Sequence, residues 1–327
     1  MTLMNILEAI NKTIDQQMEK DESIVVFGED TGFVGGVFRA TAGLQKKYGV
    51  ERVFDMPIAE AAIIGSGIGM AVAGLKPIAE IQFSGFILPG YNQVVAHAAR
   101  LRNRSRGKYH VPMVIRMPYG GGVKALEHHS ESLDVLFGHI PGLKLVVPST
   151  PYDAKGLLAS AIQDPDPVIF MEPKRIYRAF KQEVPEEEYY IPLGKAKVVN
   201  PGTDITVVAW GPFIREVQKA MKLLENDHIS VELIDLRTIS PIDEETIVES
   251  VKKTGRLLVV HEAYKSFGPG AEIISLINEK AFVYLQAPPA RLAGADITVP
   301  LPRGEHYFMI TDKKIAREIK KIMKFIP

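Results

Sequence analysis

Short apolar runs alternate with helix-like segments along this chain, and that alternation restricts the possible folds more than any other feature. Strands that alternate with helices usually join into a parallel sheet whose two faces are covered by the helices. The sequence therefore predicts an α/β protein, with a long helix at residues 88–106. In the first half, the runs expected to be strands are SIVVFG, PIAEIQF, VPMVIRM, KLVVPS and PVIFME, at residues 23–28, 77–83, 111–117, 144–149 and 167–172.

The alternation is interrupted by KQEVPEEEYYIPLG, at residues 181–194. This stretch carries prolines and a run of acids and has no helical period, which is typical of a connection. Beyond it come the predicted strands ITVVAWG, SVELIDL and RLLVVHE, with helical patterns between them. We therefore expect two domains, each a mainly parallel sheet covered by helices on both faces: residues 1–185 and 201–327, joined by a linker at 186–200.

The composition excludes several classes of protein. Lys and Arg number 39, as do Asp and Glu, so the net charge is zero, whereas nucleic-acid binders usually carry a basic excess. The chain has no cysteine, which excludes disulfides, thiolate catalysis and cysteine-based metal sites and fits a reducing, cytoplasmic compartment. The uncharged run at residues 61–75 is shorter than the roughly 18 residues that a membrane-spanning helix needs. We expect neither a nucleic-acid partner nor a membrane.

Glu60 lies at the start of a glycine-rich apolar segment that is predicted to be a helix. Carboxylates favour the first turn of a helix, and position alone could explain this one. The alternative is a buried carboxylate that holds or shares a proton with a ligand nitrogen. The glycines of GSGIG do not fit the Gly-x-Gly-x-x-Gly spacing of dinucleotide-binding turns. Gly65, Gly69 and Ala73 share one helical face, which predicts close packing on another backbone, either at a subunit interface or on the chain's own sheet.

Two further groups of residues are candidates for chemistry. In GGGVKALEHHSESLD, at residues 120–134, we expect Ser130 to cap a helix, which places His129 just before a helix N-terminus. A neutral imidazole there suits proton transfer near neutral pH, and an ordinary loop histidine is the alternative. Phe83 and Phe86 follow a predicted strand, where parallel sheets form ligand sites, although both rings could equally pack in the core.

Taken in order, these motifs resemble one family. They are DMPIAE at 55–60, GSGIGMAVAGLKPIAEIQFSGF at 65–86, RMPYGGG at 116–122, HHSES at 128–132 and PGLKLVVPSTPYDAKGLL at 141–158. The family is the β subunits of the thiamine-diphosphate-dependent 2-oxoacid dehydrogenases, the decarboxylating component of the pyruvate and branched-chain 2-oxoacid dehydrogenase complexes. The resemblance covers essentially the whole chain. It implies a pyrimidine-binding domain followed by a domain similar to the C-terminal domain of transketolase.

The resemblance implies a role for each candidate residue. Glu60 matches the acid that hydrogen-bonds to N1′ of the cofactor's aminopyrimidine and promotes the tautomer that removes the thiazolium C2 proton. Phe86 matches the aromatic residue that packs on the pyrimidine ring, with Phe83 close by. His129 matches the histidine of the active-site channel that is assigned to reductive acyl transfer to the lipoyl group.

The resemblance also implies a structural potassium site formed by Ala161, Ile162 and Asp164, near Asp166. The chain contains no Gly-Asp-Gly motif, so we expect Mg²⁺ and the diphosphate to be held mainly by an α subunit. The implied assembly is an α2β2 heterotetramer, inactive without its α subunit, that docks on a lipoyl-bearing acyltransferase core. Pyruvate and branched-chain 2-oxoacids both remain open as substrates. The alternatives are an acetoin dehydrogenase β subunit and a scaffold subunit without catalytic groups.

Overall fold

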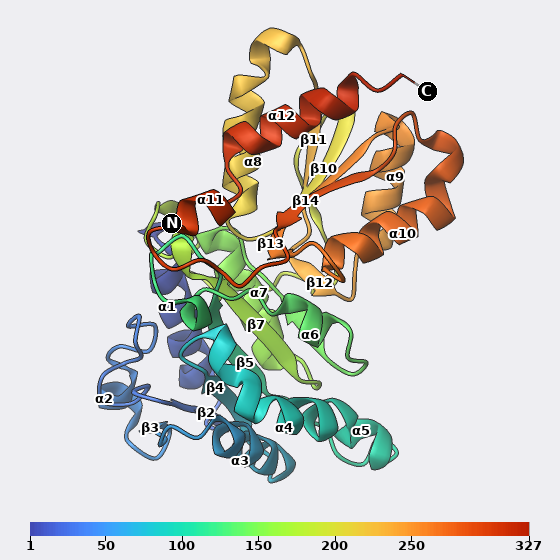
Figure 1. Cartoon of the computed structure of the whole chain (residues 1–327). Helices are drawn as coiled ribbons and strands as arrows, with labels where there is room; N and C mark the ends of the chain where they lie inside the picture. The colour runs from blue at the N-terminus through green and yellow to red at the C-terminus, as the bar shows by residue number, and fades with distance from the viewer. Residues whose placement is uncertain (327) are drawn as a thin grey trace.

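The computed structural model describes residues 1–326, and it contains two large sheets flanked by helices (Figure 1). The first sheet has seven strands in the order β12-β6-β7-β5-β4-β2-β3. All neighbouring pairs in it are parallel except β12 with β6. The strands are β2 (Ile24–Gly28), β3 (Val53–Asp55), β4 (Lys76–Glu80), β5 (Val114–Tyr119), β6 (Lys144–Val146), β7 (Val168–Pro173) and β12 (Thr238–Ser240).

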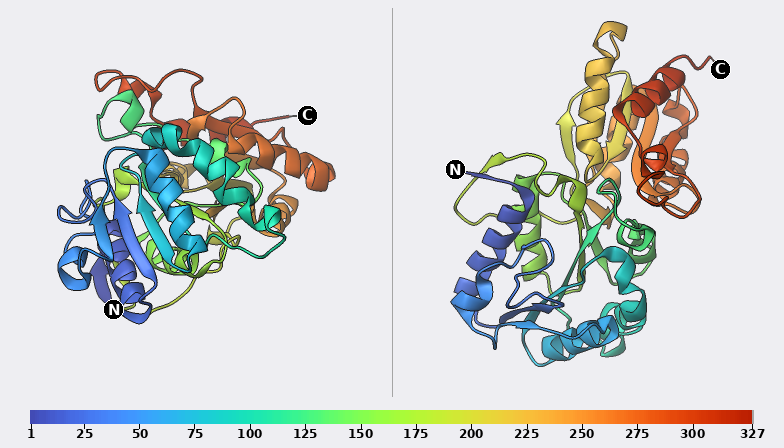
Figure 2. Two further views of the ribbon diagram at one scale, coloured as in Figure 1. Left: turned by 90° about the horizontal axis from the view of Figure 1, so that it is seen from below. Right: turned by 60° about the vertical axis from the view of Figure 1, so that its left-hand side comes forward.

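Helices cover both faces of this sheet (Figure 2). Along β2, Val26 packs into the core beneath α1 and α7, whereas Phe27 packs into the core beneath α3, as the two-residue period of a strand requires. Thr150 caps α7 by accepting a hydrogen bond from the Asp153 amide, and a proline follows at the first helical position. The helices of this half are α1 (Ile6–Lys20), α2 (Leu44–Tyr48), α3 (Glu60–Val72), α4 (Tyr91–Ala96), α5 (Leu101–Arg104), α6 (Asp134–Gly138) and α7 (Pro151–Gln163).

The second sheet has five strands in the order β14-β13-β10-β11-β9, parallel except for β9 against β11. Helices α8 and α12 pack on one face of this sheet, and α9 and α10 pack on the other. The elements are β9 (Lys197–Asn200), β10 (Ile205–Ala209), β11 (Val231–Asp235), β13 (Leu257–Tyr264), β14 (Ala290–Gly294), α8 (Phe213–Leu223), α9 (Glu244–Thr254), α10 (Pro269–Ala281), α11 (Glu305–Phe308) and α12 (Asp312–Met323). The predicted α/β class and mainly parallel sheets are confirmed.

Elements from the two halves of the chain pair with each other and pack in a common core. Strand β12 comes from the second half, yet it pairs with β6 at the edge of the first sheet. The segment 186–200, which the sequence predicts as a linker, ends in β9, the edge strand of the second sheet. One hydrophobic core includes Ile115 of the first sheet and Val208 of the second. A small additional sheet pairs β1 (Thr2–Met4) with β8 (Gln182–Val184).

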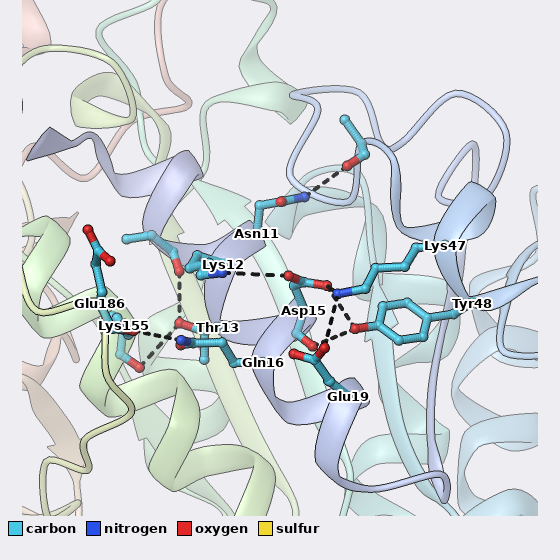
Figure 3. Close-up of polar contacts among 12 residues, drawn as sticks. Asn11, Lys12, Thr13, Asp15, Gln16, Glu19, Lys47, Tyr48, Lys155 and Glu186 are labelled. Carbon is cyan, nitrogen blue, oxygen red and sulfur yellow. Dashed lines mark hydrogen bonds and ion pairs between the residues drawn. The ribbon is translucent and has the colours of Figure 1, made fainter. Parts of the chain in front are cut away.

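Polar side chains of α1 and α7 bond to neighbouring segments of the chain (Figure 3). Asp15 of α1 accepts hydrogen bonds from Lys47 Nζ at 2.5 Å and from Tyr48 Oη at 2.8 Å. Lys155 of α7 is buried, and its Nζ donates to the carbonyl oxygen of Glu186 at 2.9 Å. These bonds attach the α2 region and the start of the connection to neighbouring helices.

Two predicted helices differ from the structure. Residues 88–106 form no continuous helix: a 3₁₀ segment, η1 (Ser84–Gly90), is followed by α4, η2 (Ala98–Arg100) and α5. Pro89 and the non-helical backbone of His97 (φ −121°, ψ −65°) account for the breaks. The helix predicted at Ser130 is also wrong, since α6 begins only at Asp134. The remaining 3₁₀ segments are η3 (Glu127–His129), η4 (Lys174–Ile176), η5 (Glu225–Asp227) and η6 (Phe282–Tyr284).

Within residues 1–326, no helix has both the length and the apolar character needed to cross a bilayer.

Candidate active site

An aromatic cluster lies beyond the carboxyl end of β4, where parallel sheets commonly form ligand sites. Phe83 precedes η1 and Phe86 lies within it, with their ring centroids 5.3 Å apart. The imidazole of His129 lies edge-on to both rings, with centroids 4.6 Å from Phe83 and 5.0 Å from Phe86. Three residues that the sequence singled out are therefore adjacent in space, although His129 is 43 residues beyond Phe86 in the numbering.

The two neighbouring histidines have different surroundings. His129 is half-buried, and its Nδ1 is buried with no hydrogen-bond partner among residues 1–326. His128 is exposed, and its Nδ1 lies 3.4 Å from Glu131 Oε2. A buried nitrogen without a partner is costly unless a ligand or water meets it. Of the two, His129 is the better candidate for contact with a ligand.

The loop from Gly120 to Glu131, here called the histidine loop, carries both histidines. The amide of Gly120 donates to the carbonyl oxygen of Glu131 at 3.1 Å, which closes the loop at its base. Ser84 Oγ at the start of η1 donates to the same carbonyl at 2.8 Å and joins the loop to the aromatic cluster. Gly120 and Gly122 have φ values of +82° and +88°, which residues with a Cβ rarely adopt. Because Ser130 ends η3 and caps no helix, His129 does not precede a helix N-terminus.

Glu60 is the first residue of α3, and its side chain is 9% exposed. The start of α3 packs tightly against the end of η1: a Cβ added at Gly90 would lie 2.8 Å from the Glu60 carbonyl oxygen. Ala59, which precedes the helix, makes no side-chain capping bond. The carboxylate is thus held at a helix start that contacts the segment bearing Phe86, in a largely buried position.

The sequence analysis missed Glu29, which directly follows β2. It is 4% exposed, and its Oε1 has no hydrogen-bond partner among the described residues. Burial raises the pKa of Glu29, and the nearby charges of Glu60 and then Asp30 raise it further. Its position after the carboxyl end of a predicted parallel strand, where ligand sites commonly form, could have identified it. Two carboxylates therefore lie close to each other in this part of the site.

The glycines of α3 lie on two faces of the helix, and these faces have different surroundings. A Cβ at Gly67 would lie 2.4 Å from Met113 Cε and 3.2 Å from Phe27 Cζ, so this glycine packs on the sheet. A Cβ at Gly69 would meet nothing within 4 Å, and one at Gly65 would meet only Gln93 Oε1, at 3.9 Å. The face that Gly65, Gly69 and Ala73 share therefore does not contact this chain's own sheet.

A buried guanidinium on β5 links two buried carboxylates, one on each of the strands that flank β5. Arg116 of β5 donates from Nε and Nη2 to the two oxygens of Glu172, at 2.7 and 3.1 Å, and from Nη1 to Glu80 at 2.8 Å. Glu80 ends β4 and Glu172 lies in β7, so the network joins the strands that lead into η1, the histidine loop and η4. All three side chains are buried.

The residues of the implied potassium site lie together at the end of α7. The amide of Asp164 donates to the carbonyl oxygen of Ala161 at 3.3 Å, and the amide of Asp166 donates to Asp164 Oδ1 at 2.9 Å. Lys144 Nζ lies 2.7 Å from Asp164 Oδ1, and Arg102 pairs with Asp166. Over residues 1–326, no group of three or more His, Cys, Asp or Glu residues is arranged to hold a metal ion.

Comparisons with known proteins first define the class. Residues 3–179 match the family described as transketolase, pyrimidine binding domain, and residues 194–315 match transketolase, C-terminal domain. A solved structure described as a split gene transketolase, inactive β4 tetramer, has a TM-score of 0.80 at 21% identity over 98% of each chain. This likeness shows that the fold is that of transketolase-like proteins.

Curated relatives narrow the class further. The chain is 70% identical to the pyruvate dehydrogenase E1 component subunit beta of Acholeplasma laidlawii over the full length of both. It is 53% identical to the protein of the same name from Mycoplasma pneumoniae over 98% of each chain. It is 46% identical to the 2-oxoisovalerate dehydrogenase subunit beta of Bacillus subtilis, covering 99% of this chain and 100% of that one. The chain belongs to the family of β subunits of the E1 components of 2-oxoacid dehydrogenases, which confirms the resemblance read from the motifs.

Proposed function

We propose that this chain is the β subunit of a pyruvate dehydrogenase E1 component. Together with an α subunit it oxidatively decarboxylates pyruvate and transfers the acetyl group to a lipoyl-lysine, whose disulfide is reduced as the thioester forms and CO₂ is released. The observation that carries the proposal is the cluster of Phe83, Phe86 and His129 beside the helix that begins with buried Glu60. The choice of pyruvate is supported by 70% identity to a pyruvate dehydrogenase subunit, against 46% to a 2-oxoisovalerate dehydrogenase subunit.

The residues of the site fit the pyrimidine half of thiamine diphosphate. When bound, this cofactor supplies the electron sink that stabilises the negative charge left on the substrate by loss of CO₂. Glu60 accepts a hydrogen bond from a ring nitrogen and holds the proton there, a role that needs a carboxylate shielded from water. Phe86 and Phe83 offer flat apolar surfaces to a ring. The half-buried imidazole of His129, which lies against both rings, is assigned to the acyl group or the lipoyl sulfur.

The partner and metal assignments belong to the same proposal. The sequence contains no Gly-Asp-Gly motif, so Mg²⁺ and the diphosphate are assigned mainly to the α subunit of an α2β2 heterotetramer. The open face of α3, at Gly65 and Gly69, supports contact with that subunit, because a glycine face permits close approach of another backbone. The second domain is assigned to docking on the lipoyl-bearing acyltransferase core.

A potassium ion at Ala161, Ile162, Asp164 and Asp166 remains part of the proposal. The last carbonyl groups of a helix lack intrahelical partners and can coordinate a cation. Lys144 and Arg102 already pair with the carboxylates, so we assign coordination to main-chain carbonyls. Melting of the assembled enzyme in KCl and NaCl of equal ionic strength tests this: higher Tm in KCl supports the site, and equal Tm values count against it.

The role of Glu60 is tested with the reconstituted enzyme. We expect Glu60→Gln to lower decarboxylation by about 10²–10⁴-fold, the range typical of lost proton-transfer catalysis, while assembly with the α subunit persists. Glu232→Gln is the control, because Glu232 is also buried but lies in the second sheet. Near-normal turnover of Glu60→Gln would exclude this role and favour the scaffold alternative.

Substrate choice is tested by kcat/KM for pyruvate, for branched-chain 2-oxoacids and for acetoin. We expect pyruvate to have the highest value. The sequence Ile-Leu-Pro after Phe86, which resembles the branched-chain members slightly more, gives the competing expectation. A higher kcat/KM for a branched-chain acid would overturn the choice of pyruvate but leave the E1 β assignment intact.

A further inference from the structure

The histidine loop is held by three buried charged side chains that contact main-chain atoms on both sides of it. Lys174, in η4 of the first domain, donates from Nζ to the carbonyl oxygen of Gly120 and to that of His129, the latter at 2.5 Å. Because Gly120 and His129 lie near the two ends of the loop, one ammonium group fixes both. Lys174 is 4% exposed.

Two carboxylates of the second domain hold the other side of the loop. Glu262 of β13 accepts a hydrogen bond from the Gly121 amide at 2.6 Å. Glu305, which begins α11, accepts from the Gly122 amide at 2.7 Å and from the Lys124 amide at 3.0 Å. Both β13 and α11 lie where the second domain meets the first (Figure 1). Charge-assisted bonds of this kind are among the stronger ones in proteins.

The glycines of the loop are what permit this arrangement. A Cβ at Gly121 would lie 3.0 Å from Glu262 Oε1 and 3.2 Å from Glu305 Oε1, and a Cβ at Gly120 would lie 2.7 Å from Glu262 Oε2. The carboxylates can reach the amides only because these side chains are absent. Burial lowers the pKa of Lys174 to about 8, because it disfavours the charged ammonium. The negative charges of Glu262 and Glu305 raise this pKa and so offset part of the effect of burial.

We propose that Lys174, Glu262 and Glu305 are positioning residues that fix the histidine loop and thereby set the imidazole of His129 against Phe83 and Phe86. The second domain thus controls the geometry of the acyl-transfer group, although it contributes no side chain to the aromatic cluster described above. The predicted effect on acyl transfer rests on the proposed function of His129. The predicted effect on the order of the loop rests only on the loop's hydrogen bonds.

The test uses the assembled enzyme with thiamine diphosphate and Mg²⁺, and compares two rates. One is lipoyl acylation, and the other is decarboxylation measured with an artificial electron acceptor. For Glu305→Gln and Gly121→Ala we expect lipoyl acylation to fall by about tenfold or more, as a misplacement of about 1 Å can cause, with decarboxylation within about twofold of the parent. Lys174→Arg should retain more acylation than Lys174→Met. Glu232→Gln is the matched control, since Glu232 is also buried in the second domain and accepts from a glycine amide, Gly202, at 3.2 Å.

Hydrogen exchange of peptides that cover residues 118–131 gives a readout independent of catalysis. Faster exchange in Glu305→Gln and Gly121→Ala, but not in Glu232→Gln, supports the positioning role. Unchanged exchange overturns it, as does an equal loss of both rates in Glu305→Gln. His129→Ala separates this inference from the proposed function. If that variant acylates normally, the role of His129 fails; if it is impaired while Glu305→Gln is normal in both rate and exchange, the positioning role fails.

Discussion

Removal of the Arg116 guanidinium is the sharpest test of how the site is supported. Arg116→Met deletes three hydrogen bonds of 2.7 to 3.1 Å and leaves Glu80 and Glu172 buried without a cation. Breaking a buried ion pair by removal of one partner typically costs about 3–5 kcal/mol, because an uncompensated charge remains. We expect a loss of this size in the free energy of unfolding at pH 7.

The loss has a pH dependence whose sign follows from the carboxylates. Burial raises the pKa of Glu80 even beside Arg116, and removal of the guanidinium raises it further. The folded variant then binds a proton that the unfolded chain releases above its ordinary pKa of 4.5, so its stability falls as the pH rises. Protonating one such carboxylate costs about 3.4 kcal/mol at pH 7 but about 0.7 kcal/mol at pH 5, at about 1.36 kcal/mol per pKa unit. Because the pKa of Glu80 is already raised in the parent, the parent shares part of this change, and the deficit of the variant should shrink by at most about 2.7 kcal/mol between pH 7 and pH 5.

Thermal unfolding of the assembled enzyme at several pH values measures this effect. At roughly 2–4 °C per kcal/mol, Arg116→Met should lower Tm at pH 7 by about 10 °C. Arg102→Met is the matched control, since the Arg102–Asp166 pair is partly exposed and should contribute less than about 1 kcal/mol. Adding Glu80→Gln to Arg116→Met should restore at least half of the loss. A small deficit that does not change with pH, or no gain from Glu80→Gln, would refute the reasoning.

Other predictions follow from single groups. Burial raises the pKa of Asp134 from 3.8 to about 7, so the folded state retains a proton that the unfolded state loses. Stability should therefore fall as the pH rises from about 4 to about 7. In Asp134→Asn, a plot of Tm against pH should lack that decline. Burial lowers the pKa of His261 to about 3, so NMR should show a neutral ring from pH 5 to pH 8, and titration within that range would contradict the assignment. Gly67→Ala meets Met113 Cε at 2.4 Å and should destabilise the chain by about 1–3 kcal/mol in denaturant melts. Gly69→Ala meets nothing within 4 Å and should stabilise the isolated chain by about 0.5–1 kcal/mol while weakening its association with the α subunit; unimpaired association would argue against an interface there.

The sequence predicted the fold class and the residues of the cluster better than it predicted the segments between them. Apolar periodicity is a local property, which is why the strands around Val26, Ile115 and Val208 could be recognised one at a time. The break at Pro89 could have been predicted from the sequence, because proline interrupts a helix. The non-helical backbone of His97 and the start of α6 at Asp134 have no comparable signal in residue type. The apolar pattern and a possible capping serine therefore gave helices at residues 88–106 and at Ser130 that the structure does not contain.

By itself the sequence determined two α/β units, a carboxylate at the start of a glycine-rich helix, and an ordered set of motifs sufficient to identify the family. Only the tertiary structure decided that the imidazole of His129 lies edge-on against both Phe83 and Phe86. It also decided that two amides of the histidine loop, those of Gly121 and Gly122, bond to carboxylates 141 and 183 positions further along the chain. The physical reason is that periodicity and turn chemistry act over a few residues. Hydrogen bonds between buried groups that are distant in sequence depend on how the sheets pack.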